Sequence, residues 1–308
     1  AAALARAAAG GARARAEGGG GAPAAPLRLL DAKAEQRAAI ALARVRLGDA
    51  AIVEAVLACD ADALAPARLE LVLRAARRDA EAAAALAVAP GDAPRLSRAS
   101  QFHRALAARV PDAARRLEGL SFAQRVEQST RNLNDDFRVL ARACEQIGRS
   151  ERLARLLERV LALGNALNAG SARGGARGFL VTDLPAAARL RGAAGSEFPT
   201  LAHFLVASAT RDGEAHTIDA EDEVPDLEAA ARCQPDAWRA AVLDLRARAA
   251  ALAAAVAAAR AAAVPGCRFV ATMAAPAERA RAAVDALEER RLATEARFRR
   301  LAASFGDD

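Results

Sequence analysis

The sequence predicts an all-α fold made of many helices. Hydrophobic residues make up 54% of the chain, but many are alanines, and aromatic residues make up only 3%, with no tyrosine. Alanine is the strongest helix former, whereas β-sandwiches are rich in β-branched and aromatic residues. Apolar residues recur at helical spacing in one segment after another, and no stretch has a convincing strand pattern. These observations favour helices that pack closely over small side chains.

The basic charge of the chain is a weak indication of function. The formal net charge is +6, and nearly all the positive charge comes from arginine, because Lys33 is the only lysine. A chain rich in both alanine and arginine indicates a compositional bias of its source genome. The charge is still compatible with an acidic partner such as nucleic acid, an anionic membrane or an acidic protein surface.

The sequence contains no pattern typical of an enzyme, a metal centre or a cofactor site. The four cysteines are far apart and form no Cys-x-x-Cys pair, so we expect reduced thiols in an intracellular protein. They are Cys59, Cys144, Cys233 and Cys267. The three histidines, His103, His203 and His216, are scattered and expected at helix surfaces or boundaries. No apolar run is long enough to cross a membrane without a charge. We therefore expect a non-enzymatic protein without a cofactor or metal.

The first third of the chain predicts a linker followed by a bundle of short helices. Residues 1–26 are mostly Ala, Gly and Arg, which indicates a disordered linker. Helices are then expected over 27–45 and 49–59, the second capped by Asp49. A third helix opens at Pro66, and a short fourth covers 79–88. A break rich in Pro and Gly at 90–94 ends this bundle.

Longer helices are expected after the break. Four of them have recognisable starts, at Ser97, Pro111, Asn134 and Ser150, and Gly148 is expected to end the third. The helix from Ser150 is amphipathic, with leucines recurring on one face.

The last third predicts an antiparallel pair of long helices. A helix over 200–209 and a solvated acidic segment over 218–223 come first. A helix over 235–263 then carries a heptad seam, and a turn leads to a return helix over 275–304 that includes Phe298 on its apolar face. The seam residues are Trp238, Val242, Leu245, Ala249, Leu252 and Val256.

Residues 164–179 form the most unusual stretch, and the residues alone leave three interpretations open. The first is a plain helix end and loop, because glycine adopts positive φ readily. The second is RNA binding through Arg173-Gly174-Gly175, although such elements normally act as repeated disordered arrays. The third is a docking surface, because Asn165 and Asn168 share a helix face and their amides can bond to another chain's backbone.

A family resemblance adds to these interpretations. The stretch resembles the signature of the formin homology 2 domain, the actin-assembling core of formins. It reads Gly164-Asn165-x-x-Asn168-x-Gly170-Ser171-x-Arg173-Gly174-x-Ala176-x-Gly178-Phe179. Other segments resemble further motifs of that family, in family order: 30–42, 96–102, 142–151, 200–205 and 305–308. The resemblance covers residues 27–308.

The resemblance implies an elongated subunit with a lasso, linker, knob, coiled-coil region and post. Two such subunits close head-to-tail into a ring, each lasso encircling the partner's post, and the ring caps and follows the barbed end of an actin filament. The knob is expected over 27–90 and the coiled-coil and post regions over 91–308. No lasso is recognisable in residues 1–26, which contain no Trp.

The resemblance also implies two sets of site residues. Ile40 matches the knob isoleucine that contacts actin, with Lys33, Arg37 and Arg44 as a basic rim, whereas spacing alone favours Ile40 in the knob core. The post surface that receives a lasso corresponds to Gly164, Asn165, Asn168, Gly170, Arg173, Gly174, Gly178 and Phe179.

The implied function is an actin-binding module that nucleates filaments or caps their barbed ends. Actin is the expected partner, with a homodimer by lasso–post exchange if the full protein has a lasso, and we expect no nucleic acid or membrane partner. The expected location is the cytoplasm, at the actin cytoskeleton. The alternative is a helical scaffold that has lost filament assembly, because the lasso and an actin-contacting lysine, expected near Ala194, are absent.

Overall fold

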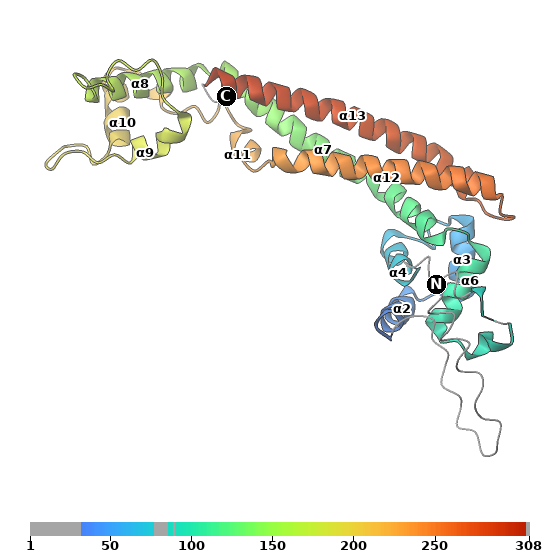
Figure 1. Cartoon of the computed structure of the whole chain (residues 1–308). Helices are drawn as coiled ribbons and strands as arrows, with labels where there is room; N and C mark the ends of the chain where they lie inside the picture. The colour runs from blue at the N-terminus through green and yellow to red at the C-terminus, as the bar shows by residue number, and fades with distance from the viewer. Residues whose placement is uncertain (1–31, 77–85, 89, 306–308) are drawn as a thin grey trace. The chain divides into compact units, whose positions relative to one another are not determined.

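The computed structural model describes residues 32–76, 86–88 and 90–305, and these residues form helices joined by turns (Figure 1). The prediction of an all-α fold is confirmed, since the described residues contain only an isolated bridge between Arg191 and Thr200 and no strand. None of the helices in these ranges is long and apolar enough to cross a membrane. The expected linker at 1–26 and most of the helix expected over 79–88 lie outside the described residues. So do residues 27–31 of the helix expected over 27–45 and residues 306–308 of the motif at 305–308.

The described residues belong to two compact units. One lies within Ala1–Leu117 together with Val264–Cys267, and the other within Glu118–Ala263 together with Arg268–Asp308. The boundary falls near the start of the long helix α7, Ala113–Arg149.

The first unit is a bundle of short helices, which we call the α2–α6 bundle. Its elements are α2 (Ala32–Val45), α3 (Asp49–Ala58), α4 (Pro66–Ala76), η1 (Pro90–Arg95) and α6 (Arg98–Arg109). Helix α2 packs on α4 and α6, and α3 packs on α6. Leu42, Ile52, Leu69, Val72 and Phe102 are at most 1% exposed and form the centre of its core.

Two helix starts in this bundle compare a predicted N-cap residue with the cap in the structure. Ser97 caps α6 as predicted, because its side chain accepts a hydrogen bond from the Ser100 amide at 3.2 Å. The prediction that Asp49 caps α3 is wrong, since Gly48 is the cap and Asp49 is the first helical residue. The Asp49 carboxylate instead pairs with Arg98 at 3.0 Å, which joins α3 to α6.

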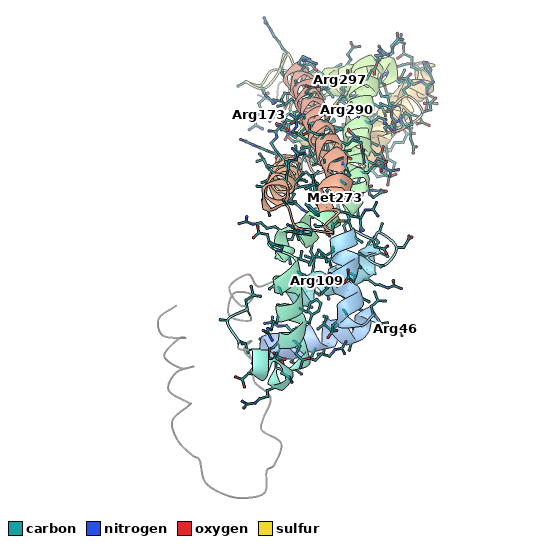
Figure 2. All side chains as sticks on the ribbon, turned by 90° about the vertical axis from the view of Figure 1, so that its right-hand side faces the viewer. Arg46, Arg109, Arg173, Met273, Arg290 and Arg297 are labelled. Atoms are coloured by element: carbon teal, nitrogen blue, oxygen red, sulfur yellow. The ribbon has the colours of Figure 1, made fainter. Side chains whose placement is uncertain are left out.

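Further polar contacts fix α6 within this bundle. Arg109 of α6, labelled in Figure 2, forms an exposed ion pair with Glu54 of α3. His103 is 4% exposed beside Phe102, so its predicted place at a helix surface or boundary is wrong. The packing of α6 against two other helices covers this histidine.

Helix α7 runs without a break for 37 residues. The prediction of two helices, with the second starting at Asn134, is therefore wrong. A polar residue such as Asn costs less than about 0.7 kcal/mol in a helix interior, which burial of neighbours such as Phe137 and Leu140 easily outweighs. Gly119 has a packing role in this helix, because a Cβ there would lie 2.9 Å from Cδ1 of Leu252.

Helices α12 (Pro235–Ala262) and α13 (Phe269–Ser304) pack side by side along their length (Figure 1). The predicted heptad seam is confirmed, since all six of its residues are buried. Trp238 from this seam meets Phe137 of α7 edge-on, with ring centroids 4.7 Å apart.

The start of the return helix is earlier than predicted. Helix α13 begins at Phe269 and contains Pro276, whose ring nitrogen cannot donate a helical hydrogen bond. Phe269 and Met273 are buried at 0% and 8% exposure, and this burial holds the turns before the proline in place. The prediction that Phe298 lies on the apolar packing face is wrong, because its side chain is 43% exposed.

Residues 151–217, which we call the 151–217 segment, bury fewer of their side chains than the helices described above. Its elements are α8 (Glu151–Leu167), η2 (Val181–Asp183), α9 (Leu184–Ala188), α10 (Leu201–Arg211) and η3 (Ala215–Thr217). All of its residues are described, and of these only Ala209 and Thr217 are buried. Arg159 of α8 pairs with Asp212 at 3.0 Å and with Glu214, and the hydrogen bond from Arg159 lowers the pKa of Glu214.

The acidic segment after η3 is attached to the neighbouring helices. The prediction that residues 218–223 are solvated is confirmed in that none of them is buried, but the segment is also tied down, because Ser150 donates a hydrogen bond to Glu223 at 2.6 Å. The Ser150 hydroxyl also accepts from the Leu153 amide, so it caps α8 as predicted. The hydrogen bond from Ser150 lowers the pKa of Glu223, and Arg152 pairs with Asp222 at 2.6 Å.

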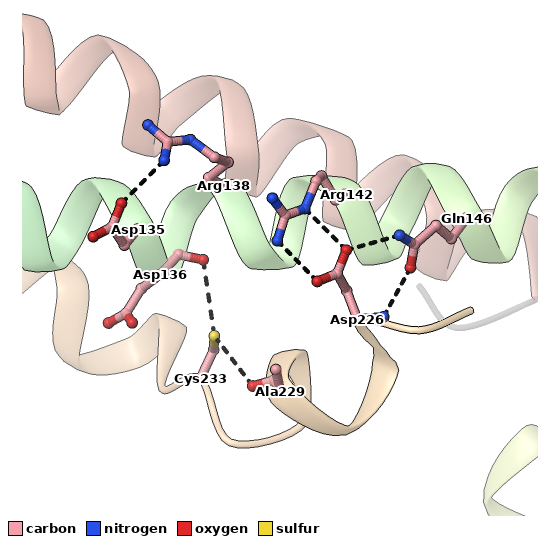
Figure 3. A network of polar contacts seen from close by, with 8 residues as sticks. All are labelled: Asp135, Asp136, Arg138, Arg142, Gln146, Asp226, Ala229 and Cys233. Carbon is pink, nitrogen blue, oxygen red and sulfur yellow. Dashed lines mark hydrogen bonds and ion pairs between the residues drawn. The ribbon is translucent and has the colours of Figure 1, made fainter. Parts of the chain in front are cut away.

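Asp226, just before α11 (Leu227–Ala230), is held by α7 (Figure 3). Arg142 donates to both of its carboxylate oxygens, at 2.9 and 2.8 Å, and Gln146 donates at 2.7 Å. The Asp226 amide donates back to Gln146 at 3.1 Å. The guanidinium of Arg142 is the main reason that the pKa of Asp226 is lowered.

Candidate functional site

The four residues predicted for partner contact in α2 lie on one exposed face. Lys33, Arg37, Ile40 and Arg44 are spaced four, three and four residues apart and are all exposed. Such spacing places side chains along a single stripe of a helix. Ile40 is 53% exposed, and among the described residues 32–76 it is the large apolar side chain that stays at the surface. The structure therefore brings these four residues together as one surface.

The opposite face of α2 explains why Ile40 is outside. Ala34, Ala38, Leu42 and Val45 are buried against α4 and α6 and fill the side of α2 that faces the core. Glu35 is also on that side, and it accepts a hydrogen bond from Ser100 at 3.3 Å. The structure thus decides against a core position for Ile40, which helical spacing alone had favoured.

The α2 stripe has the chemistry of an apolar anchor with a basic rim. Burying an isoleucine fully is worth roughly 1.5–3 kcal/mol, so half-exposed Ile40 retains apolar area that a partner can cover. The Arg37 Nε donates to the Lys33 carbonyl at 3.2 Å, which orients that guanidinium along the helix. A partner surface with an apolar cleft and nearby carboxylates would match this stripe.

The 164–179 stretch forms the end of α8 and a compact loop. The side chain of Asn165 makes two hydrogen bonds with Ala176, donating to its carbonyl at 2.9 Å and accepting from its amide at 2.7 Å. Asn168 caps the helix, and its amide group donates to the Gly164 carbonyl at 2.9 Å. Both amide side chains therefore make hydrogen bonds within the chain, whereas one of the three interpretations left open by the sequence expected them to bond to another chain's backbone.

Glycines are required in this loop by backbone geometry. Gly170 and Gly175 have φ values of +76° and +71°, which side-chain-bearing residues rarely adopt. A Cβ on Gly174 would lie 2.7 Å from the Asn168 carbonyl oxygen, so the backbone approaches too closely for any other residue. Arg173 is exposed beside it. The Arg-Gly-Gly sequence therefore has a local structural role, as in the helix-end interpretation.

The loop is surrounded by apolar side chains that remain exposed. Leu167, Leu180 and Val181 are 59%, 55% and 44% exposed, and Phe179 is half-buried. Gly164 and Gly178 have open space where a Cβ would lie. Sequence analysis missed Leu180 and Val181, because two apolar residues in a loop have no periodicity. The signal that remained was their position directly after the glycine-rich stretch.

The apolar face of α8 extends this surface. The side chains on the apolar face predicted for this helix are all half-buried, and none in α8 is buried. They are Leu153, Leu156, Leu157, Val160, Leu161 and Leu163. On α10, Val206 is 49% exposed. We use the name α8 surface for these side chains of α8 and α10 together with the 164–179 loop and the adjoining Leu180 and Val181.

The titratable residues of the described ranges form no obvious chemical centre. Within those ranges no group of three His, Cys, Asp or Glu residues is placed to hold a metal ion. No disulfide joins the four cysteines, and burial raises the pKa of the Cys144 thiol. His203 lies at the start of α10, 2.7 Å from the Thr200 hydroxyl.

Comparison with known proteins points to one family. The family model described as Formin Homology 2 Domain matches residues 14–308, which begins earlier than residue 27. The chain is 32% identical to Formin-like protein 1 of Arabidopsis thaliana over 184 residues, 60% of this chain and 17% of that protein. It is 30% identical to Formin-like protein 4 of Oryza sativa subsp. japonica over 195 residues, 63% of this chain and 22% of that protein.

The chain thus spans less than a quarter of the length of these relatives. The match to the family model, in contrast, covers nearly the whole chain and includes both the α2 stripe and the α8 surface. The chain belongs to the formin homology 2 domain family.

Proposed function

We propose that this chain is an actin-binding module that acts at the barbed ends of filaments. The observation that carries the proposal is the exposed Ile40 in the middle of a basic stripe on α2. Family membership supports it, since the α2 segment resembles a motif of actin-assembling domains at the matching position. The core side of α2 is complete without Ile40, so a role in contact explains its position better than a role in folding.

The α8 surface supports a second part of this proposal, which is association of two subunits. Its leucines are half-buried, and Leu167, Leu180 and Val181 are exposed at or directly after the 164–179 stretch, so an apolar segment from another subunit would bury area there. The open space at Gly164 and Gly178 leaves room for such a segment. On this proposal the α8 surface is the post that receives a partner's lasso.

The actin contact is tested by elongation from filament seeds. We expect the chain to change the rate of barbed-end growth, and Ile40→Ala to weaken this effect by roughly 2 kcal/mol, or about thirtyfold in affinity. Leu243→Ala is the matched control, because Leu243 of α12 is a similarly exposed leucine at 52%. Both substitutions are at the surface and should change folding stability by less than about 0.5 kcal/mol.

Two results would count against the actin contact. An unchanged elongation rate at micromolar chain concentration would contradict activity of this chain. An equal effect of Ile40→Ala and Leu243→Ala would contradict the assignment of the contact to α2.

The alternative function is a helical scaffold that keeps the fold without assembling filaments. The observation that favours it is the turn at 192–196, where the family's second actin-contacting lysine is expected and this chain has none. Arg189 and Arg191 are exposed next to this turn, and either is a candidate to replace that lysine. A mass measurement by light scattering separates the two functions, because a strict monomer that ignores actin would support the scaffold.

A further inference from the structure

A groove lies between α7 and α13 within the second unit, and none of its residues belongs to the α2 stripe or the α8 surface. Its volume is about 350 Å³. Its lining includes Phe137, which is 2% exposed, and the buried Thr294. Ala141 and Ala293 also line it, and their small side chains leave the space between the two helices open. The inner part of the groove is therefore mainly apolar.

The rest of the lining consists of three arginines and the neutral Asn134. Arg138 of α7 and Arg290 and Arg297 of α13 line the groove, and no carboxylate is among the described residues that do so. Figure 2 shows Arg290 and Arg297 on the ribbon of α13. They are seven residues apart, so their backbone positions are separated by roughly 10 Å along the helix.

The present partners of the α13 arginines leave them available. Arg290 donates to the side-chain oxygen of Asn134 at 3.0 Å, and this acceptor is neutral. Arg297 is 3.9 Å from Glu145, and Glu145 also pairs with Arg149 at 2.7 Å. A carboxylate supplied by a partner would therefore give Arg290 and Arg297 closer charged contacts than they have within the chain.

The third arginine of the groove, Arg138, can also exchange its present ion pair for one with a partner. Arg138 pairs with Asp135 at 3.1 Å, and the two side chains are 62% and 66% exposed. Exposed pairs of this kind contribute little to stability, so exchanging one for a partner carboxylate loses little.

We propose that this groove docks an acidic polypeptide segment in which an apolar side chain lies between carboxylates. The apolar side chain enters the space above Ala141 and Ala293, and the carboxylates meet the arginines. Alternate side chains of an extended chain share a face, so a Glu-x-Leu-x-Glu segment presents its leucine between two carboxylates roughly 13 Å apart, a separation that long arginine side chains can span. A free phosphate would satisfy the arginines but would leave the apolar part of the groove uncovered, so the observations favour a peptide.

The test is fluorescence anisotropy of a labelled peptide of sequence Glu-Glu-Leu-Glu-Glu-Leu-Glu-Glu, titrated with the whole chain. The double variant Arg290→Gln, Arg297→Gln should weaken binding roughly tenfold or more. The control double variant Arg279→Gln, Arg300→Gln removes the same charge from exposed sites of α13 that do not line the groove, and binding should change little.

A steric variant separates the groove from general charge attraction. Ala293→Phe fills the space without changing any charge, so it should also weaken binding, while circular dichroism confirms that the helices persist. A peptide with serine in place of leucine should bind more weakly for the same reason, and added salt should weaken all binding.

Three outcomes would overturn the proposal. The first is equal weakening by the groove pair and by the control pair of arginine substitutions. The second is unchanged binding to the Ala293→Phe variant. The third is tighter binding of a labelled single-stranded RNA that shows the same dependence on Arg290 and Arg297. None of these results bears on the actin proposal, because actin elongation is measured separately.

Discussion

The α2–α6 bundle and the 151–217 segment are both built from short helices, yet they bury their apolar residues to very different degrees. The bundle has a core whose central side chains, such as Ile52 and Val72, are fully buried. In the 151–217 segment only Ala209 and Thr217 are buried, and every leucine of the α8 face stays half-exposed. The bundle thus completes its own core, whereas the segment leaves an apolar surface for something else to cover.

The difference follows from how each region uses its chain. In the bundle, α2 is covered by both α4 and α6. In the segment, long turns such as 168–180 and 189–200 separate the helices, and α9 is only five residues long. Helix α8 therefore has few neighbours, and polar contacts such as Arg159 with Asp212 hold the segment together. An amphipathic helix does not by itself make a core, because a core needs a covering layer on each apolar face.

The largest expected effect tests this contrast in stability directly. Leu69→Ala, at a site that is 1% exposed, should destabilise the bundle by about 2–5 kcal/mol. The matched change Leu157→Ala on the half-buried α8 face should lower the free energy of unfolding by less than half as much. Urea unfolding followed by circular dichroism measures both, and hydrogen exchange assigns each change to its region.

Equal losses in these two variants would break the comparison, since they would mean that the α8 face is as well packed as the bundle core. A loss of unfolding free energy from Leu157→Ala that becomes larger only at high chain concentration would sharpen the comparison. That result is expected if a second subunit covers the face.

An intermediate effect is expected for the loop in the 151–217 segment. Gly174→Ala should destabilise the loop by about 1–3 kcal/mol, because the new Cβ would lie 2.7 Å from the Asn168 carbonyl oxygen. Gly164→Ala is the matched control, since nothing lies within 4 Å of a Cβ there. Hydrogen exchange of residues 170–178 measures the effect. Similar exchange in both variants would show that the loop is loose and that its glycines carry no packing constraint.

The smallest expected effect is a loss of hydrogen-exchange protection at low pH. The pKa values of Glu214, Glu223 and Asp226 are lowered by their hydrogen bonds with Arg159, Ser150 and Arg142, respectively. Their stabilisation is therefore present above the unfolded carboxyl pKa of about 4 and is lost as the pH falls through the lower folded values. The backbone amide hydrogens of residues 212–226 should exchange faster at low pH, after correction for the pH dependence of the intrinsic exchange rates. The bundle core, which is held by apolar burial, should stay protected at the same pH.

Loss of protection in the bundle first would contradict this order. It would mean that the polar contacts of residues 212–226 are not what attaches them to α7 and α8.

Parts of the fold follow from the sequence because they depend on local chemistry. The caps Ser97 and Ser150 and the heptad seam of α12 are confirmed, since a cap needs only nearby amides and a seam needs only a repeat. The failures involve long-range packing. Asn134 does not start a helix, and α13 begins before Pro276, because buried neighbours outweigh a weak local signal. Residues 218–223 pair with α8, which no pattern within the acidic run could indicate.

The sequence by itself determined the helical class, the paired long helices and the family, because composition, heptad spacing and an ordered set of motifs are local properties of the chain. Only the tertiary structure decided that Ile40 is outside. The side of α2 that packs against α4 and α6 is already filled by other residues of the helix. Only the structure showed that Asn165 and Asn168 use their side-chain amides in hydrogen bonds within the helix end and its loop, and that arginines line a groove between α7 and α13. These outcomes depend on which faces meet, and periodicity shows that a face is apolar without showing what covers it.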